Sequence, residues 1–204
     1  MWIVLILAAV TGMAIGAPSS QPPESGLSLP QALADRFVRG VASIRIQDKT
    51  FLGVWERPEP DRESFEVLEE REGLYYSALR FANEGSDWQS VSTLEDGRLP
   101  GFVLRSEGAD YWYGQTTIVA FVKGRFEVVY RGLDTTEIVD LNNDGYPELF
   151  ASGWPDADGG PESTTVYVWS GQTFEKLMVV RFKQRFGPRV VAAVRAYRRR
   201  VPPS

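Results

Sequence analysis

Two residue types that carry much of enzyme chemistry are missing from this chain of 204 residues, which contains no histidine and no cysteine. Without histidine, the commonest general base, the Ser-His-Asp triad and the usual zinc and iron ligands are excluded. Without cysteine, the chain has no disulfide, no lipid-anchoring cysteine and no thiol nucleophile. A phosphate-binding glycine-rich loop is also absent, because the DADGG segment at 156–160 lacks the required lysine and following helix.

The start of the chain is apolar and then turns abruptly polar. Residues 1–17, MWIVLILAAVTGMAIGA, end in small residues and predict a secretory signal peptide cleaved after Gly16 or Ala17. The run is too short and too rich in Gly and Ala at its end to favour a membrane-spanning helix. Residues 18–28 predict a Pro/Ser-rich linker. We therefore expect a one-domain exported protein, secreted or periplasmic.

Charge is distributed unevenly along the chain. Residues 1–180 contain 14 basic and 27 acidic residues, a net charge of −13, whereas residues 181–204 carry +8 and no acid. An acidic body disfavours nucleic acid and suits cation binding. The basic tail, residues 183–204, predicts a helix with an apolar stripe at Val190, Val191, Val194 and Tyr197. We favour a tail that docks on the domain; the alternative is weak contact with an anionic surface.

The most informative stretch is DLNNDGYPEL, from Asp140 to Leu149. A hard cation such as Ca²⁺ needs six to eight oxygens at about 2.3–2.6 Å, and a curled chain supplies them from alternate side chains. Gly145 permits the sharp turn that brings the carbonyl of Tyr146 into the ring. We predict a calcium site formed by Asp140, Asn142, Asp144, Tyr146 and Glu148. The alternative is a metal-free turn in which Asn and Asp bond to their own backbone.

The residues after this loop indicate a strand rather than a helix. Ala151 stands where an EF-hand needs a bidentate glutamate, and Pro147 opposes a following helix. The segment DLNNDGYPELFASG resembles the loop and first strand of FG-GAP/VCBS repeats, the calcium-bearing blades of integrin-alpha-type β-propellers. The resemblance covers residues 135–180 well and 87–131 loosely. It implies an antiparallel blade with calcium on one rim, held by the five residues named above.

A second copy of this unit precedes it at a spacing of 48 residues. The matching pairs are Val91/Val139, Asp96/Asp144, Gly97/Gly145, Phe102/Phe150, Thr116/Thr164, Thr117/Thr165, Phe126/Phe174 and Glu127/Glu175. Such a period has the size of one propeller blade. Earlier segments have the same strand-turn-strand texture in weaker register. We expect about three units, residues 41–90, 91–138 and 139–182.

The earlier loop is a degenerate copy. Ser92, Leu94 and Pro100 replace three of the four side-chain ligands, and only Asp96 and Gly97 remain. Leucine cannot coordinate a cation and proline removes the last carboxylate. We therefore expect one calcium ion per chain.

The predicted fold is all-β, with antiparallel blade-like sheets from about three β-propeller-type repeats over residues 29–182 and short helices at both ends. Ser28 and Pro30 are typical of a helix start, with Leu33 and Phe37 on one face of that helix. A closed propeller takes four to eight blades, so either the arrangement is open or subunits complete a ring.

These patterns favour an exported calcium-binding module for recognition or structural stabilisation, not an enzyme, with a protein or glycan partner. Aromatic residues at 111–113 and Trp154 are candidates for stacking on sugar, although core packing is the commoner role of such residues. Two alternatives stay open. One is a glycan hydrolase that uses a pair of carboxylates, and the other is a metal-independent secreted inhibitor or adhesion protein.

Overall fold

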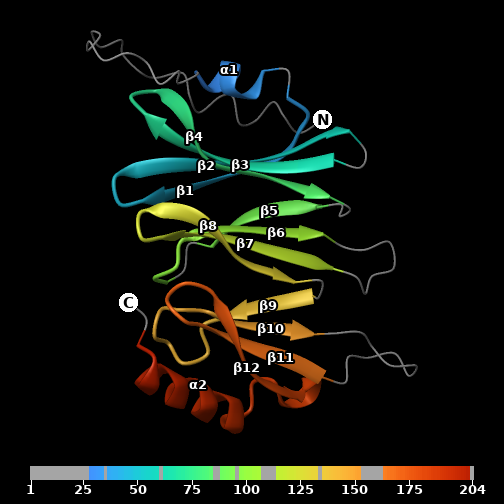
Figure 1. Ribbon diagram of the computed structural model, residues 1–204, viewed down its shortest axis with the longest axis vertical. Helices are drawn as coiled ribbons and strands as arrows, with labels where there is room; N and C mark the ends of the chain where they lie inside the picture. Colours follow the sequence, from blue (N-terminus) through green and yellow to red (C-terminus); the bar gives the residue numbers. More distant parts are fainter. Residues whose placement is uncertain are drawn as a thin grey trace.

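The computed structural model describes residues 28–34, 36–59, 62–84, 88–94, 97–106, 114–132, 135–152 and 163–202. It confirms the all-β class: three four-stranded antiparallel sheets are stacked along the long axis of the molecule (Figure 1). The predicted signal peptide and residues 18–27 of the predicted linker lie outside the described residues.

Each sheet uses four consecutive strands in chain order. The first sheet contains β1 (Val38–Ile46), β2 (Lys49–Glu59), β3 (Arg62–Arg71) and β4 (Leu74–Glu84). The second contains β5 (Ser90–Leu94), β6 (Gly101–Ser106), β7 (Gln115–Val122) and β8 (Arg125–Gly132). The third contains β9 (Thr135–Val139), β10 (Glu148–Ser152), β11 (Ser163–Trp169) and β12 (Phe174–Arg181).

The third sheet begins earlier in the chain than the predicted third unit does. That unit was placed at 139–182, whereas β9 already starts at Thr135 and precedes the predicted calcium loop. Its sequence, TTEIV, is short and has a charge at its centre. A five-residue strand of this kind gives only a weak strand signal, so the sequence pattern does not include it in the third unit.

The repeat is visible in the pairing of the strands. The hairpin β7–β8 has a bulge between Ile118 and Val119, and the hairpin β11–β12 has one between Val166 and Tyr167. The first of these positions differs from the second by the 48-residue period. The hairpin β3–β4 is also bulged, between Val67 and Leu68. A bulge increases the local twist, so all three sheets twist at the same point of their outer hairpins.

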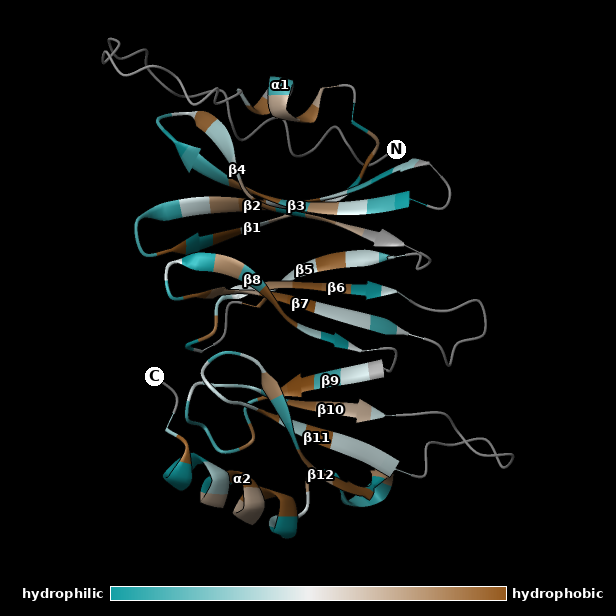
Figure 2. Ribbon diagram, viewed as in Figure 1, coloured by the Kyte–Doolittle hydropathy of each residue, from teal (hydrophilic) through white to brown (hydrophobic). Residues whose placement is uncertain are grey.

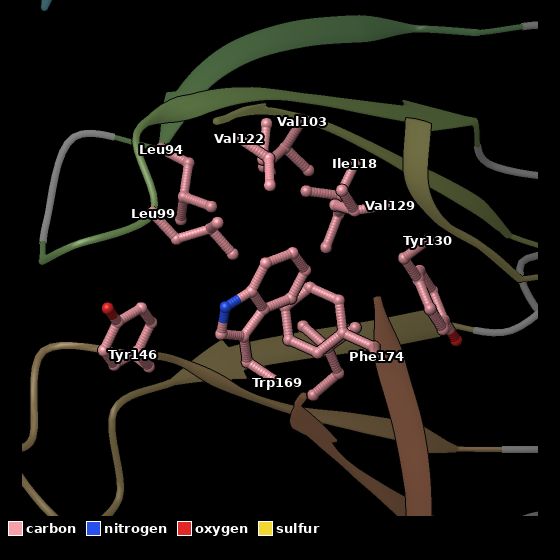
Figure 3. Packing of buried hydrophobic residues seen from close by; sticks show 12 residues of the cluster. Leu94, Leu99, Val103, Ile118, Val122, Val129, Tyr130, Tyr146, Trp169 and Phe174 are labelled. Atoms are coloured by element: carbon pink, nitrogen blue, oxygen red, sulfur yellow. The ribbon is translucent and has the colours of Figure 1, made fainter. Parts of the chain in front are cut away.

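Two apolar clusters fill the spaces between the sheets. Phe65 of the first sheet and Phe102 of the second pack at a ring-centroid distance of 5.6 Å and are both fully buried. Between the second and third sheets, Trp169 lies at the centre of the other cluster, beside Phe174 (Figure 3). Hydrophobic residues lie within the strands of all three sheets, and several hairpin ends are more hydrophilic (Figure 2). Burial of these side chains, at about 25 cal/mol per Å² of apolar surface, holds the stack together.

Short helices cover both outer faces of the stack (Figure 1). Helix α1 (Leu29–Leu33) begins with a capping box between Ser28 and Gln31 and packs on the first sheet. It ends before Phe37, which was predicted to lie on the helix but follows it and is 62% exposed. The chain turns extended at Ala34, so the apolar spacing did not continue as helix.

The C-terminal part of the chain covers the third sheet. A 3₁₀ turn, η2 (Phe182–Gln184), precedes helix α2 (Pro188–Arg200). Val190 and Val194 of α2 are buried against Phe150 and the valines of β11. Within the described residues the stack is open, with a helix of the same chain on each end. No helix in this part of the chain is both long and apolar enough to cross a membrane.

Candidate metal centre

The predicted calcium loop joins β9 to β10 at one edge of the third sheet. Asp140 follows the last residue of β9, and Glu148 is the first residue of β10. Gly145 has a φ of 86° and Asn143 a φ of 57°, so the chain enters left-handed backbone space twice within the loop. Glycine and asparagine are the residues that adopt this conformation at least cost. The loop therefore curls as the sequence predicts.

Hydrogen bonds to the backbone fix the polar side chains inside this curl. The carboxylate of Asp140 accepts from the N–H groups of Asp144, at 3.1 Å, and Gly145, at 2.8 Å. Asn142 Oδ1 accepts from Asp144 N–H at 3.0 Å, and Asp144 Oδ1 accepts from Tyr146 N–H at 2.9 Å. Asn and Asp form such bonds in turns without any ion, so these contacts suit both the calcium site and the metal-free turn.

Glu148 is the most deeply placed of the predicted ligands. Its side chain is fully buried, and its Oε2 accepts a hydrogen bond of 2.9 Å from the N–H of Leu141. Burial raises the pKa of Glu148 from 4.5 to about 7, against the opposing effects of that N–H group and of the Arg198 guanidinium. A carboxylate held in this way favours a cationic neighbour, because a nearby positive charge stabilises its ionised form.

Arg198 supplies such a neighbour from helix α2. Its Nε lies 2.9 Å from Asp144 Oδ2, its Nη2 lies 3.3 Å from Glu148 Oε1, and its Nη1 donates to the carbonyl of Trp169. The side chain is only 9% exposed. The sequence of the loop does not indicate Arg198 as a neighbour of the site. A signal was present, because Arg198 follows the buried Val194 by four residues and so lies on the same helix face.

Tyr146 anchors the loop to the core rather than standing free at the rim. Its ring is 9% exposed and belongs to the cluster between the second and third sheets, where it lies at one end (Figure 3). The guanidinium of Arg198 is 5.5 Å from the ring centroid and that of Arg98 is 5.9 Å away. The sequence assigned only the carbonyl of Tyr146 to the site. The ring of Tyr146 has a second role, because its burial in the cluster fixes the position of the loop.

The degenerate loop of the second sheet packs against the predicted calcium loop. Arg98 N–H donates to the carbonyl of Gly145 at 2.6 Å. A Cβ atom on Gly97 would lie 2.2 Å from that same oxygen, so no larger residue fits at this contact. Leu94 is buried in the cluster between the sheets, so it serves packing, and the carbonyl of Pro100 accepts a hydrogen bond from Phe121 N–H. Asp96 lies outside the described residues.

The residues of the loop suit a hard divalent cation in donor type and in charge. Asp140, Asp144 and Glu148 carry three negative charges and Arg198 carries one positive charge, so the ionised cluster has a net charge of −2. In the described part of the chain, however, no three Asp, Glu, His or Cys residues lie together as a ready metal site. Arg198 occupies one oxygen of Asp144 and one of Glu148. A cation would have to compete with this guanidinium.

The other aromatic candidates, residues 111–113 and Trp154, lie outside the described residues. Comparison of the chain with models of protein families gave no match, and comparison with curated proteins gave none either.

Proposed function

We propose that this chain is an exported calcium-binding module of the FG-GAP/VCBS type, which serves recognition or structural stabilisation and has a protein or glycan partner. The observation that carries the proposal is that Asp140, Asn142, Asp144 and Glu148 lie on one curled loop, where each accepts a hydrogen bond from a backbone N–H group of the loop. Calcium would be held by these side chains and by the carbonyl of Tyr146. It supplies two positive charges, which matches the net charge that Arg198 leaves uncompensated.

The place of the loop in the fold explains how cation binding would stabilise the domain. Tyr146 belongs to the cluster between two sheets, and Gly145 accepts a hydrogen bond from the loop of the second sheet. Asp144 and Glu148 contact helix α2 through Arg198. The loop thus contacts the second sheet, the third sheet and α2. Neutralising its carboxylates lowers their mutual repulsion at a junction of all three.

The experiment is thermal melting of the mature chain in calcium, in magnesium and in chelator. Wild type should melt higher in calcium, with an affinity on the order of 10⁻⁴–10⁻³ M, as in extracellular modules. Asp144→Ala should abolish the shift. Asp96→Ala is the matched control, since Asp96 is the equivalent residue of the degenerate loop, and should keep it. Identical melting of wild type in calcium and in chelator would show that the loop is a metal-free turn.

A second candidate is a metal-independent recognition or adhesion module. The contacts of Arg198 favour it, because the guanidinium already gives Asp144 and Glu148 a cationic partner within the chain. In that case Asp144→Ala would lower the melting temperature equally in calcium and in chelator. The same set of melts therefore separates the two functions.

A further inference from the structure

The outer face of the first sheet carries a cavity that the calcium loop does not involve. Its volume is about 550 Å³, within the range of about 300–1,000 Å³ typical of small-molecule sites. It lies between helix α1 and strands β2 to β4, at the opposite end of the stack from α2 (Figure 1). The residues that matter for its chemistry are Arg36, Phe37, Glu56, Glu66, Tyr75 and Arg80.

Two buried carboxylates lie on the floor of this cavity. Glu56 is 5% exposed and Glu66 is 6% exposed, on the neighbouring strands β2 and β3. Arg36 binds both: its Nη2 donates to Glu66 Oε2 at 2.6 Å, and its Nε contacts Glu56 Oε1. Glu56 Oε2 also accepts from Ser64 Oγ at 3.1 Å and lies 3.4 Å from Arg80 Nη2. The four charged side chains sum to zero.

Two aromatic side chains also line the cavity. Phe37 is 62% exposed beside it, and Tyr75 is half-buried in its wall. The side chain of Arg80 is 59% exposed, so it presents donors to a ligand while its Nη2 remains near Glu56. A ligand would therefore meet flat apolar surface, guanidinium donors and carboxylate acceptors within one small space.

We propose that this cavity binds a neutral saccharide. A sugar hydroxyl both donates and accepts, so it can bond to a carboxylate and to a guanidinium at once. An anion would face Glu56 and Glu66, and a cation would face Arg36 and Arg80; a neutral polyol meets neither repulsion. The apolar face of a sugar ring suits an exposed aromatic ring. This inference rests on the recognition part of the proposed function and is independent of calcium.

The arrangement of the carboxylates indicates binding without cleavage. A glycoside hydrolase uses one carboxyl as an acid and the other as a base or nucleophile. Here one guanidinium occupies an oxygen of Glu56 and an oxygen of Glu66. Both carboxylates therefore share one cation instead of standing apart as a separate acid and base. The same contacts keep the two carboxylates fixed as acceptors.

The test is a saccharide array with neutral, acidic and amino sugars, probed with the mature chain in calcium and in chelator. Neutral saccharides should bind equally in both buffers. Phe37→Ala and Arg80→Gln should each weaken the best binder about tenfold or more, as expected for loss of a contact to a charged or stacked group. Matched controls are Phe186→Ala and Arg125→Gln, which remove an exposed phenylalanine and an exposed, ion-paired arginine elsewhere.

Unchanged melting temperatures of all four variants show that the fold is kept. Failure of every neutral saccharide to bind, a preference for acidic or amino sugars, or equal binding by Phe37→Ala and Phe186→Ala would overturn the proposal. Release of reducing sugar from a bound saccharide would also overturn it and indicate a hydrolase. Absence of a calcium effect on melting refutes the metal site alone, because saccharide binding is read out separately.

Discussion

Arg198→Ala tests whether the proposed calcium loop depends on a cation supplied by the chain itself. The guanidinium lies within ion-pairing distance of both Asp144 and Glu148, and Glu148 is fully buried. Removing one partner of a buried ion pair costs about 3–5 kcal/mol, because the other charge stays buried without compensation. Glu148 can take up a proton in response, so we expect the lower end, about 3 kcal/mol.

The expected shift in melting temperature follows from the size of the domain. One kcal/mol corresponds to about 2–4 °C for a domain of about 150–250 residues, so Arg198→Ala should melt roughly 6–12 °C lower in chelator. In calcium the loss should be smaller, because the cation no longer competes with the guanidinium for Asp144 and Glu148. The difference between melting in calcium and melting in chelator should therefore be larger in the variant than in wild type.

The assay is calorimetric melting at about pH 8, where Glu148 is largely ionised. Arg199→Ala is the matched control, since Arg199 is the next residue of α2 and is exposed. Arg198→Lys keeps the charge and should recover part of the stability in chelator. Equal melting of Arg198→Ala and Arg199→Ala in chelator would refute the counter-ion role. A smaller calcium shift in Arg198→Ala than in wild type would refute the competition.

Two further predictions concern Glu148 and helix α2. The folded pKa of Glu148, about 7, is above the ordinary 4.5, so its contribution to stability is fully present below about pH 4.5 and is lost as the pH rises through 7. In chelator, wild type should lose on the order of 3 kcal/mol more than Glu148→Gln between about pH 4.5 and pH 8, measured by urea unfolding; parallel profiles of the two proteins would contradict this. Truncation after Phe186 removes the buried Val190 and Val194 and should lower stability by about 1.5–3 kcal/mol for each. An unchanged melt together with lost, salt-sensitive binding to anionic vesicles would show instead that the tail is a free cationic arm.

The sequence predicts the repeated sheets because their signals are local. Hairpins such as β7–β8 have β-branched and aromatic residues on both sides of a turn, and Gly124 has a positive φ there, of 86°. The loop at 140–147 is also local, since its conformation follows from Gly145 and from short-range bonds of Asp140. The strand β9 could not be predicted, because five residues with a charge at the centre do not show a clear alternation of apolar and polar residues.

Contacts between distant segments could not be predicted in the same way. Arg198 reaches Glu148 across 50 residues, and Arg36 reaches Glu66 across 30. The sequence does not show which acidic residue either arginine meets. Helical spacing gives the face on which Arg198 lies, but not the loop that this face meets. That depends on how α2 crosses the third sheet, which the valines set through packing.

The two outer faces of the stack differ in a way that stability alone does not explain. The third sheet presents apolar residues, among them Phe150 and Val166, to an apolar stripe of α2. The first sheet presents Val54 and Leu68 to α1, but beside them it buries Glu56 and Glu66. A buried ion-pair network is often no more stable than apolar residues of similar volume, because desolvation of the charges offsets their attraction. If this face served only to hold α1, apolar residues such as Val54 and Leu68 would be enough. Glu56 and Glu66, with their arginine partners, instead line the cavity with fixed donors and acceptors. Recognition of a neutral polar ligand requires this arrangement.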